Sequence, residues 1–143
     1  VVHRDPEHFM AYFHLGRYSE QLGRTGEAVT YHRAAAELSG RAPYLTAFLG
    51  LVLVLVGDRN EAEDIANDLE RKARRGSSIA TCLGALLIRL GRVDEGLAWL
   101  ETALEAKEEL LLLIDTPWLP IPEVRDTKRF RSLCARLPET RER

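Results

Sequence analysis

Apolar residues recur along most of the chain at intervals of three and four, the spacing that places them on one face of an α-helix. The helical stretches come in pairs, and the pairs repeat with a period of 34 residues. A glycine marks the turn inside each pair, at Gly23, Gly57 and Gly91. Two further landmarks keep the same spacing: Leu15-Gly16, Leu49-Gly50 and Leu83-Gly84, and then Glu27-Ala28, Glu61-Ala62 and Glu95-Gly96. The pattern therefore predicts three helix-turn-helix units without an insertion.

This period and these landmarks resemble the tetratricopeptide repeat, a helix-turn-helix unit that stacks because one unit cannot bury its apolar face alone. The resemblance implies an all-α fold, a right-handed α-solenoid of helical hairpins with a C-terminal capping helix. It also implies a scaffold for protein-protein interaction, and we expect no enzymatic activity.

The period also sets the expected boundaries along the chain. The expected units are residues 1–8, the end of an upstream repeat; 9–42, 43–76 and 77–110, the three repeats; and 111–143, a proline-rich loop with a capping helix. Asp5-Pro6 stands where a closing proline would lie, and the sequence opens on Val1 rather than a methionine, with no signal-peptide pattern visible after it. We therefore expect a single repeat domain that is a fragment of a longer protein.

Three local features bear on individual helices. The stretch from Leu49 to Val56 is almost continuously apolar, so we expect this helix to be covered on all sides. Ser77-Ser78 is expected to cap the first helix of the third unit. Gly96 stands where the other units have alanine, at a cost of about 1 kcal/mol in a helix. Either the two helices approach each other closely at this position, or the glycine has no packing role and its cost is tolerated.

The pattern stops after the third unit. Pro117, Pro120 and Pro122 predict an extended loop, because proline removes a hydrogen-bond donor and fixes the backbone. Asp126-Thr127 is expected to cap a last short helix. Its apolar stripe consists of Phe130, Leu133, Cys134 and Leu137.

The end of the chain carries a second resemblance. It is similar to the closing segment of many bacterial signalling proteins, in which such repeats follow a winged-helix regulator, a nucleotide cyclase or a protein kinase domain. The segments that carry this resemblance are Gly91 to Leu100, Pro117-Trp118-Leu119, Val124 to Asp126 and Arg129 to Leu133. It implies the sensory or docking part of a larger bacterial regulator.

The family resemblance also implies a partner-binding surface, because the first helix of each repeat lines the concave side of such arrays. The implied residues are Phe13, Arg17 and Gln21 from the first unit, Ala47, Leu51, Val54 and Leu55 from the second, and Thr81, Ala85, Ile88 and Arg89 from the third. This lining has an apolar floor and charged edges. We expect an apolar helix or extended segment to bind there, with Arg17 and Arg89 adding charge selectivity.

Several alternatives to this binding mode stay open. The chain's own tail, for example Trp118, Leu119 and Ile121, or upstream repeats could already fill the apolar lining. An exposed apolar groove would also favour a homodimer. The competing function classes are an RNA-binding or ligand-regulated helical module and a purely structural spacer.

The composition limits the classes of partner molecule that we expect. The 143 residues are 45% hydrophobic, and 20 basic against 22 acidic residues give a net charge of -2, which argues against nucleic acid as a partner. The basic run from Arg71 to Arg75 is balanced by acidic residues of the same helix and lacks interleaved aromatic residues. Two cysteines, Cys82 and Cys134, suit a reducing, cytoplasmic location.

Candidate chemistry is sparse. No apolar run in this sequence reaches the roughly 20 residues that cross a bilayer. Of the four histidines, His8, His14 and His32 have no carboxylate at the helical spacing of four that a zinc site needs, and we expect none of the four, His3 included, to bind a metal. No catalytic triad pattern or phosphate-binding glycine loop is present in the sequence. We therefore expect no catalytic residue, no metal and no cofactor.

Overall fold

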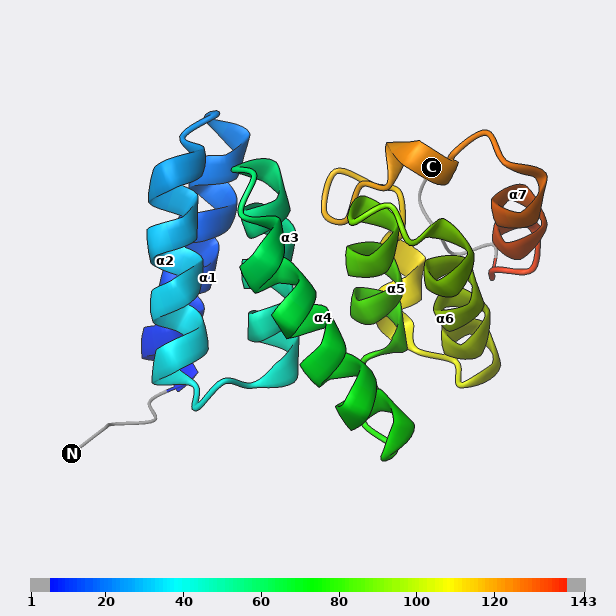
Figure 1. Cartoon of the computed structure of the whole chain (residues 1–143), viewed down its shortest axis with the longest axis horizontal. Coiled ribbons are helices and arrows are strands. Elements are labelled where there is room, and N and C mark those ends of the chain that lie inside the picture. Colours follow the sequence, from blue (N-terminus) through cyan, green and yellow to red (C-terminus); the bar gives the residue numbers. More distant parts are fainter. Residues whose placement is uncertain (1–5, 139–143) are drawn as a thin grey trace. The chain divides into compact units, whose positions relative to one another are not determined.

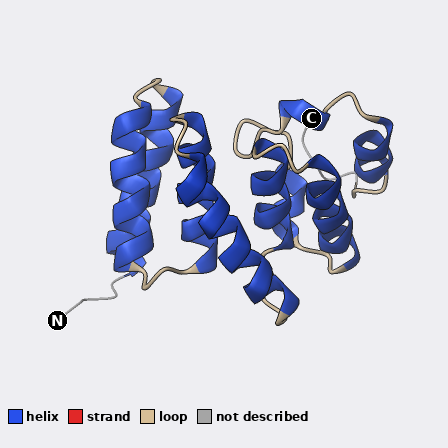
Figure 2. Ribbon diagram, in the orientation of Figure 1, coloured by secondary structure: helices blue, strands red, loops and turns tan. Residues whose placement is uncertain are grey.

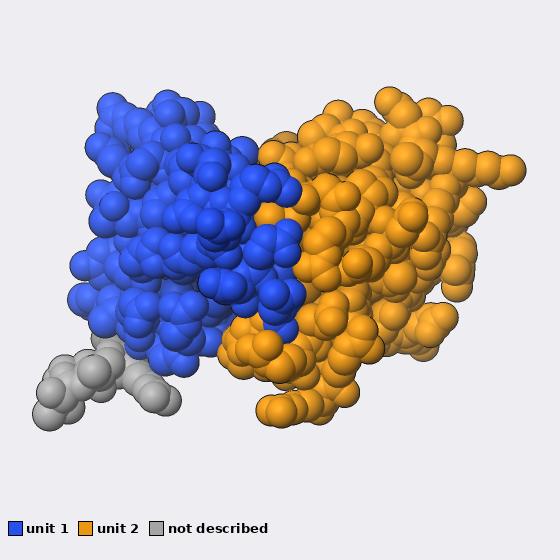
Figure 3. All heavy atoms as spheres, viewed as in Figure 1, with its two compact units in different colours: residues 1–67 blue, residues 68–143 orange. Residues whose placement is uncertain are grey.

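The computed structural model describes residues 6–138 as helices joined by short loops, with no β-strand in that range (Figure 2). The chain divides into two compact units, residues 1–67 and 68–143 (Figure 3). From here on they are called the first and the second unit, and the 34-residue units of the sequence are called predicted units. The all-α fold class is confirmed for the described residues. The predicted end of an upstream repeat falls largely outside them, and α1 begins at Pro6, three residues before the predicted boundary at Phe9.

The first unit is built from α1 (Pro6–Gln21), α2 (Thr25–Leu38), α3 (Pro43–Leu55) and the start of α4 (Arg59–Arg74) (Figure 1). Helix α1 pairs with α2, and α2 packs in turn against α3. The predicted turn glycines Gly23 and Gly57 have φ angles of +76° and +87°, which residues with a Cβ rarely adopt.

Helix α3 is less completely covered than its sequence predicts. Leu49, Val52 and Leu53 are buried, but Leu55 and Val56 are 48% and 42% exposed. The expectation of cover on all sides is therefore wrong at the end of the helix. The physical reason is that α3 ends at Leu55, and Val56 begins the turn to α4.

The second unit contains the end of α4, then α5 (Ala80–Arg89), α6 (Val93–Glu105) and α7 (Lys128–Ala135). Between α6 and α7 lie two short 3-10 helices, η1 (Glu109–Leu113) and η2 (Pro122–Val124), which both contact α5. Residues 109–124 are called the tail segment below. Its fully buried side chains, Leu111, Ile114, Leu119, Ile121 and Val124, join the core of this unit.

Two predictions about the tail are settled by the structure. Thr127 caps α7, since its hydroxyl oxygen accepts a hydrogen bond from the Phe130 amide at 3.3 Å. The proline-rich loop is not extended throughout, because Pro122 opens the single turn η2. Proline is tolerated there because the first residue of a helix has no intrahelical partner for its amide.

Candidate partner-binding site

Two of the predicted binding residues in the first unit lie inside its core. Phe13 is 2% exposed and Ala47 is completely buried. The Phe13 ring lies edge-on to Phe48 of α3, with ring centroids 5.1 Å apart, and Tyr44 lies 5.6 Å from it. Phe13 therefore fastens α1 to α3, and its side chain is not part of the accessible surface.

A buried polar chain lies beside these aromatic rings, and sequence reasoning missed it. His32 Nε2 lies 2.6 Å from Glu20 Oε2, and Glu20 accepts a further hydrogen bond from Arg17 at 3.2 Å. The Arg17 guanidinium also lies 5.1 Å above the Phe48 ring centre. His32 is fully buried, so it is a packing residue of this core. The Arg17 guanidinium is therefore already paired with the Glu20 carboxylate.

The accessible predicted residues of the first unit occupy adjacent helix faces. Leu51 and Val54 are half-buried, whereas Gln21 and Leu55 are exposed. Leu51 and Leu55 share one face of α3 with Tyr44 and Phe48, since the spacing is three or four residues. Arg17 joins this face to α1 through its contact with Phe48. We call this surface the α1–α3 face and define it by Arg17, Gln21, Tyr44, Leu51 and Leu55.

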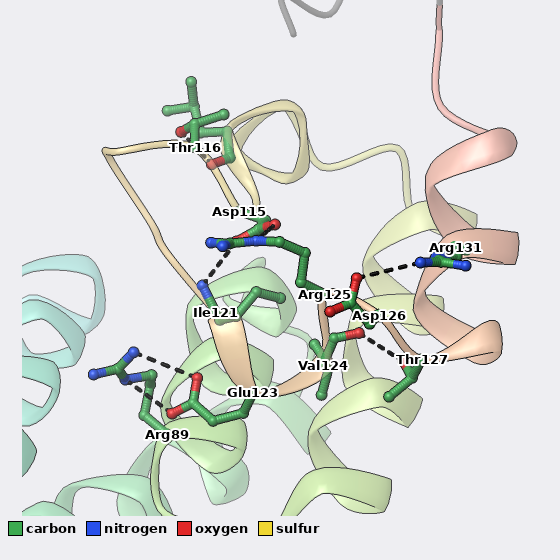
Figure 4. Close-up of polar contacts among 11 residues, drawn as sticks. Arg89, Asp115, Thr116, Ile121, Glu123, Val124, Arg125, Asp126, Thr127 and Arg131 are labelled. Atoms are coloured by element: carbon green, nitrogen blue, oxygen red, sulfur yellow. Dashed lines mark hydrogen bonds and ion pairs between the residues drawn. The ribbon is translucent and has the colours of Figure 1, made fainter.

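The equivalent helix of the second unit is covered. Thr81, Ala85 and Ile88 of α5 have no exposed surface. Arg89, the fourth predicted residue there, forms an ion pair with Glu123 of η2 at 3.3 Å (Figure 4). The tail segment therefore packs on α5, which agrees with the alternative that the chain's own tail fills part of the predicted lining. Leu119 and Ile121 are buried as that alternative requires, but Trp118 is 46% exposed.

Asp115 holds the tail segment in its turn. Its carboxylate accepts two hydrogen bonds from the Arg125 guanidinium, at 2.6 and 2.8 Å, and one from the Ile121 amide at 3.3 Å (Figure 4). Asp115 closes a ten-residue span through this pair, so the segment is fixed by side chains as well as by burial.

Glu108 caps α5 from a distant part of the sequence. Its carboxylate accepts hydrogen bonds from the amides of Ala80 and Thr81, at 3.0 and 2.9 Å, and from the Thr81 hydroxyl at 2.8 Å. The prediction that Ser77-Ser78 caps this helix is wrong, because the helix begins at Ala80 and Glu108 satisfies its first amides. Burial, with a smaller contribution from Glu108, raises the pKa of the neighbouring Cys82 thiol to about 12, so this cysteine is an inert core residue.

The basic run at the end of α4 is neutralised by its own helix. Arg71 and Lys72 both pair with Asp68, at 3.1 and 3.0 Å, and Arg74 lies 3.6 Å from Glu70. The hydrogen bond from Lys72 is the main cause that lowers the pKa of Asp68. The contacts support the prediction of a solvated, self-neutralised face.

Other candidate sites yield little within residues 6–138. An open cavity of about 540 Å³ beside α4 and α6 is lined by Glu70, Arg74, Arg92, Glu95 and Trp99, so its charges balance. No group of three or more histidine, cysteine, aspartate or glutamate side chains in that range is arranged to hold a metal ion. None of the helices described is both long enough and apolar enough to cross a membrane.

The hairpins and the helix faces described above define a helical-repeat protein. Residues 11–41 and residues 78–102 each match a family model described as tetratricopeptide repeat. The chain is a tetratricopeptide repeat protein, and the two matches fall in the first and third predicted units. Such repeats generally serve as non-catalytic modules for protein-protein interaction. No curated protein and no solved structure matches the chain.

Proposed function

We propose that this protein docks a segment of a partner protein on the α1–α3 face. The observation that carries the proposal is the contrast in cover between equivalent helices. Thr81, Ala85 and Ile88 of α5 are buried beneath the chain's own residues. On α3, Leu51 and Val54, one period before Ala85 and Ile88, are only half-buried, and Leu55 beside them is 48% exposed. Burial of this apolar surface by a partner is favourable by about 25 cal/mol per Å².

The chemistry of the face favours an apolar helix or extended segment. Leu51 and Leu55 offer apolar surface, and Gln21 and Tyr44 offer polar groups at its edge. Arg17 is a weaker source of charge selectivity than the sequence predicts, because Glu20 already accepts a hydrogen bond from it. Arg89 is engaged by Glu123 in the same way.

A peptide library displayed on phage tests the proposal. We expect selected peptides to be rich in apolar residues and to lose about tenfold in affinity for a Leu55→Glu variant, as expected when a charge replaces an apolar contact. Thr102→Glu on α6 is the matched control, because Thr102 is also exposed on a helix. Selected peptides that bind Leu55→Glu as well as the original chain would overturn the proposal.

The wider role is part of the same proposal. The resemblance of the tail to bacterial signalling proteins supports a docking part within a larger regulator in the cytoplasm. A homodimer through the α1–α3 face would bury the same Leu55 side chain, so light scattering of the original chain and Leu55→Glu tests it directly. RNA binding has less support, because Arg71, Lys72 and Arg74 are paired with carboxylates.

A further inference from the structure

The tail segment shows what kind of chain covers the first helix of a hairpin in this protein. From Trp118 to Ile121 its exposed and buried side chains alternate, since Leu119 and Ile121 are buried whereas Trp118 and Pro120 are exposed. An alternation with a period of two is typical of an extended backbone. Leu119 also forms an isolated β-bridge with Ile114. Because η1 and η2 on either side both contact α5, this helix is covered by a segment that is extended at its centre.

The prolines suit this segment to an apolar helix face. Proline has no backbone N–H group, and an extended backbone cannot satisfy its N–H groups within its own segment. Pro117, Pro120 and Pro122 therefore remove three donors that a mostly apolar surface could not satisfy. Proline also fixes φ, so less conformational entropy is lost when the segment becomes ordered.

Acidic side chains fix the chain at two positions of α5. Glu108, directly before the tail segment, accepts a hydrogen bond from the Thr81 hydroxyl at 2.8 Å. Glu123, near the end of the segment, pairs with Arg89 at 3.3 Å (Figure 4). Thr81 and Arg89 are separated by about 12 Å along the helix, since each residue adds about 1.5 Å. The segment is therefore anchored by charge at two points with apolar residues between them.

Helix α3 carries apolar residues at both of the equivalent positions. Ala47 and Leu55 stand one period of 34 before Thr81 and Arg89. Ala47 is completely buried, whereas Leu55 is 48% exposed. A carboxylate placed against Leu55 would lose hydration without gaining the partner that Arg89 provides, which costs free energy. A segment that lies on α3 as the tail lies on α5 therefore needs an apolar residue in the place of Glu123.

We propose that the partner segment on the α1–α3 face is extended, apolar and contains proline, like the tail segment, but has an apolar residue where the tail has Glu123. Leu55 recognises this position of the partner and excludes an acidic side chain there, whereas Arg89 on α5 selects one. This inference rests on the proposed docking function and names the chemistry of the segment that docks.

Two peptides are the probes: residues 117–124 of the chain, and the same peptide with Glu123→Leu. Each is titrated into the isotopically labelled full chain, and amide NMR shifts give the dissociation constant and the residues perturbed. We expect the Glu123→Leu peptide to bind with a Kd of about 1 mM or tighter and to shift amides around Leu51 and Leu55. We expect the unchanged peptide to bind about tenfold more weakly, because its carboxylate meets an apolar side chain.

A Leu55→Arg variant tests whether this residue sets the preference. We expect it to bind the unchanged peptide about fivefold more tightly than the Glu123→Leu peptide, because arginine supplies the partner that Glu123 has on α5. Leu55 is 48% exposed, so the change should leave the fold intact, as circular dichroism checks. Thr30→Arg, at an exposed position of α2, is the matched control and should keep the original preference. An unaltered preference in Leu55→Arg would overturn the proposal.

A third peptide tests the extended backbone. It carries Glu123→Leu together with Pro120→Ala and Pro122→Ala. We expect it to bind about threefold more weakly than the Glu123→Leu peptide, since alanine restores the amides and the flexibility of the free peptide. Tighter binding of this peptide would show that the face takes a helix, and the proposal would be wrong.

The docking function and this inference fail in different ways. If phage-selected peptides depend on Leu55 while neither tail peptide perturbs the α1–α3 face, the docking function stands and this inference is overturned. Shifts on α5 and the tail segment would show that the peptides displace the chain's own tail, which also overturns it. If neither the selected peptides nor the tail peptides bind, both proposals are wrong.

Discussion

The hairpins α1–α2 and α5–α6 bring their helices together at the same repeat position in different ways. In the first hairpin, a Cβ added to Gly16 would lie 2.8 Å from His32 Nε2, so the glycine makes room for a side chain. In the second hairpin, a Cβ on Gly84 would lie 2.8 Å from Leu100 Cδ2 and also 2.8 Å from the Gly96 carbonyl oxygen, so the glycine makes room for backbone as well as for a side chain. The partners also correspond, because His32 and Leu100 are two periods of 34 apart.

The difference shows that a repeated small residue can make a contact in one hairpin, here with backbone, that the other hairpin lacks. The first hairpin keeps Ala28 and inserts a ring, whereas the second has Gly96 at that position. A Cβ on Gly96 would lie 2.7 Å from the Gly84 carbonyl oxygen and 2.5 Å from Ile88 Cγ1. Of the two interpretations of Gly96 that the sequence leaves open, close approach of the helices is confirmed.

The largest effect is expected for Gly96→Ala, which places a methyl group against backbone that cannot move aside. We expect the free energy of unfolding to fall by about 3 kcal/mol, despite the gain in helix propensity of about 1 kcal/mol. Urea unfolding measures it. Gly26→Ala in α2 is the control, because no heavy atom lies within 4 Å of an added Cβ there and the change should stabilise the helix.

Equal free energies of unfolding for Gly96→Ala and the control Gly26→Ala would contradict this contrast between the hairpins. Position 96 would then tolerate a side chain, and the two helices would not approach closely there. Hydrogen exchange of α5 and α6 in the Gly96→Ala variant would locate the loss, because it should be confined to this hairpin.

Gly16→Ala is expected to cost less, about 2 kcal/mol, because the obstructing atoms belong to a side chain. The clash requires the His32 ring, so Gly16→Ala combined with His32→Ala should be more stable than the sum of the single changes by about 1 kcal/mol. A double-mutant cycle by thermal unfolding measures this coupling. Strict additivity would show that His32 is not the reason for Gly16.

Glu108→Gln tests how the second unit starts its first helix. The amide side chain keeps the size but loses the negative charge at the N-terminus of α5, where the helix dipole favours it. We expect a loss of about 1 kcal/mol and faster amide exchange at Ala80 and Thr81. Ser77→Ala should have little effect, and a larger loss for Ser77→Ala would restore the capping role that the sequence predicts.

The periodic pattern predicts the hairpins and the turn glycines, and the Asp126-Thr127 pair predicts the cap of α7, because each of these depends on residues a few positions apart. The cap from Glu108 lies 27 and 28 residues from its donors, and no local pattern marks it. The cover of α5 by the tail segment is also invisible locally, since Leu119 and Ile121 suit either a core or a loop. The α1–α3 face combines four of the predicted residues with Tyr44, which the sequence does not single out, and its use as a binding site stays a proposal.

The smallest effect is expected from two ion pairs, Arg33–Glu61 in the first unit and Arg129–Glu101 in the second. In each pair the residues are 28 positions apart, but the arginine comes first in one pair and the glutamate in the other. Hydrogen bonding from the partner arginine lowers the pKa of both Glu61 and Glu101, so their stabilisation is present above the unfolded value near 4.3 and is lost as pH falls through the lower folded values. Both pairs are more than one-third exposed at the arginine, so each contributes about 0.5 kcal/mol at most. Glu61→Gln and Glu101→Gln should therefore each flatten the acid side of the stability curve slightly and equally, as urea unfolding at pH 3 and pH 7 measures. A larger effect for one of them would show that the two ion pairs are not equivalent.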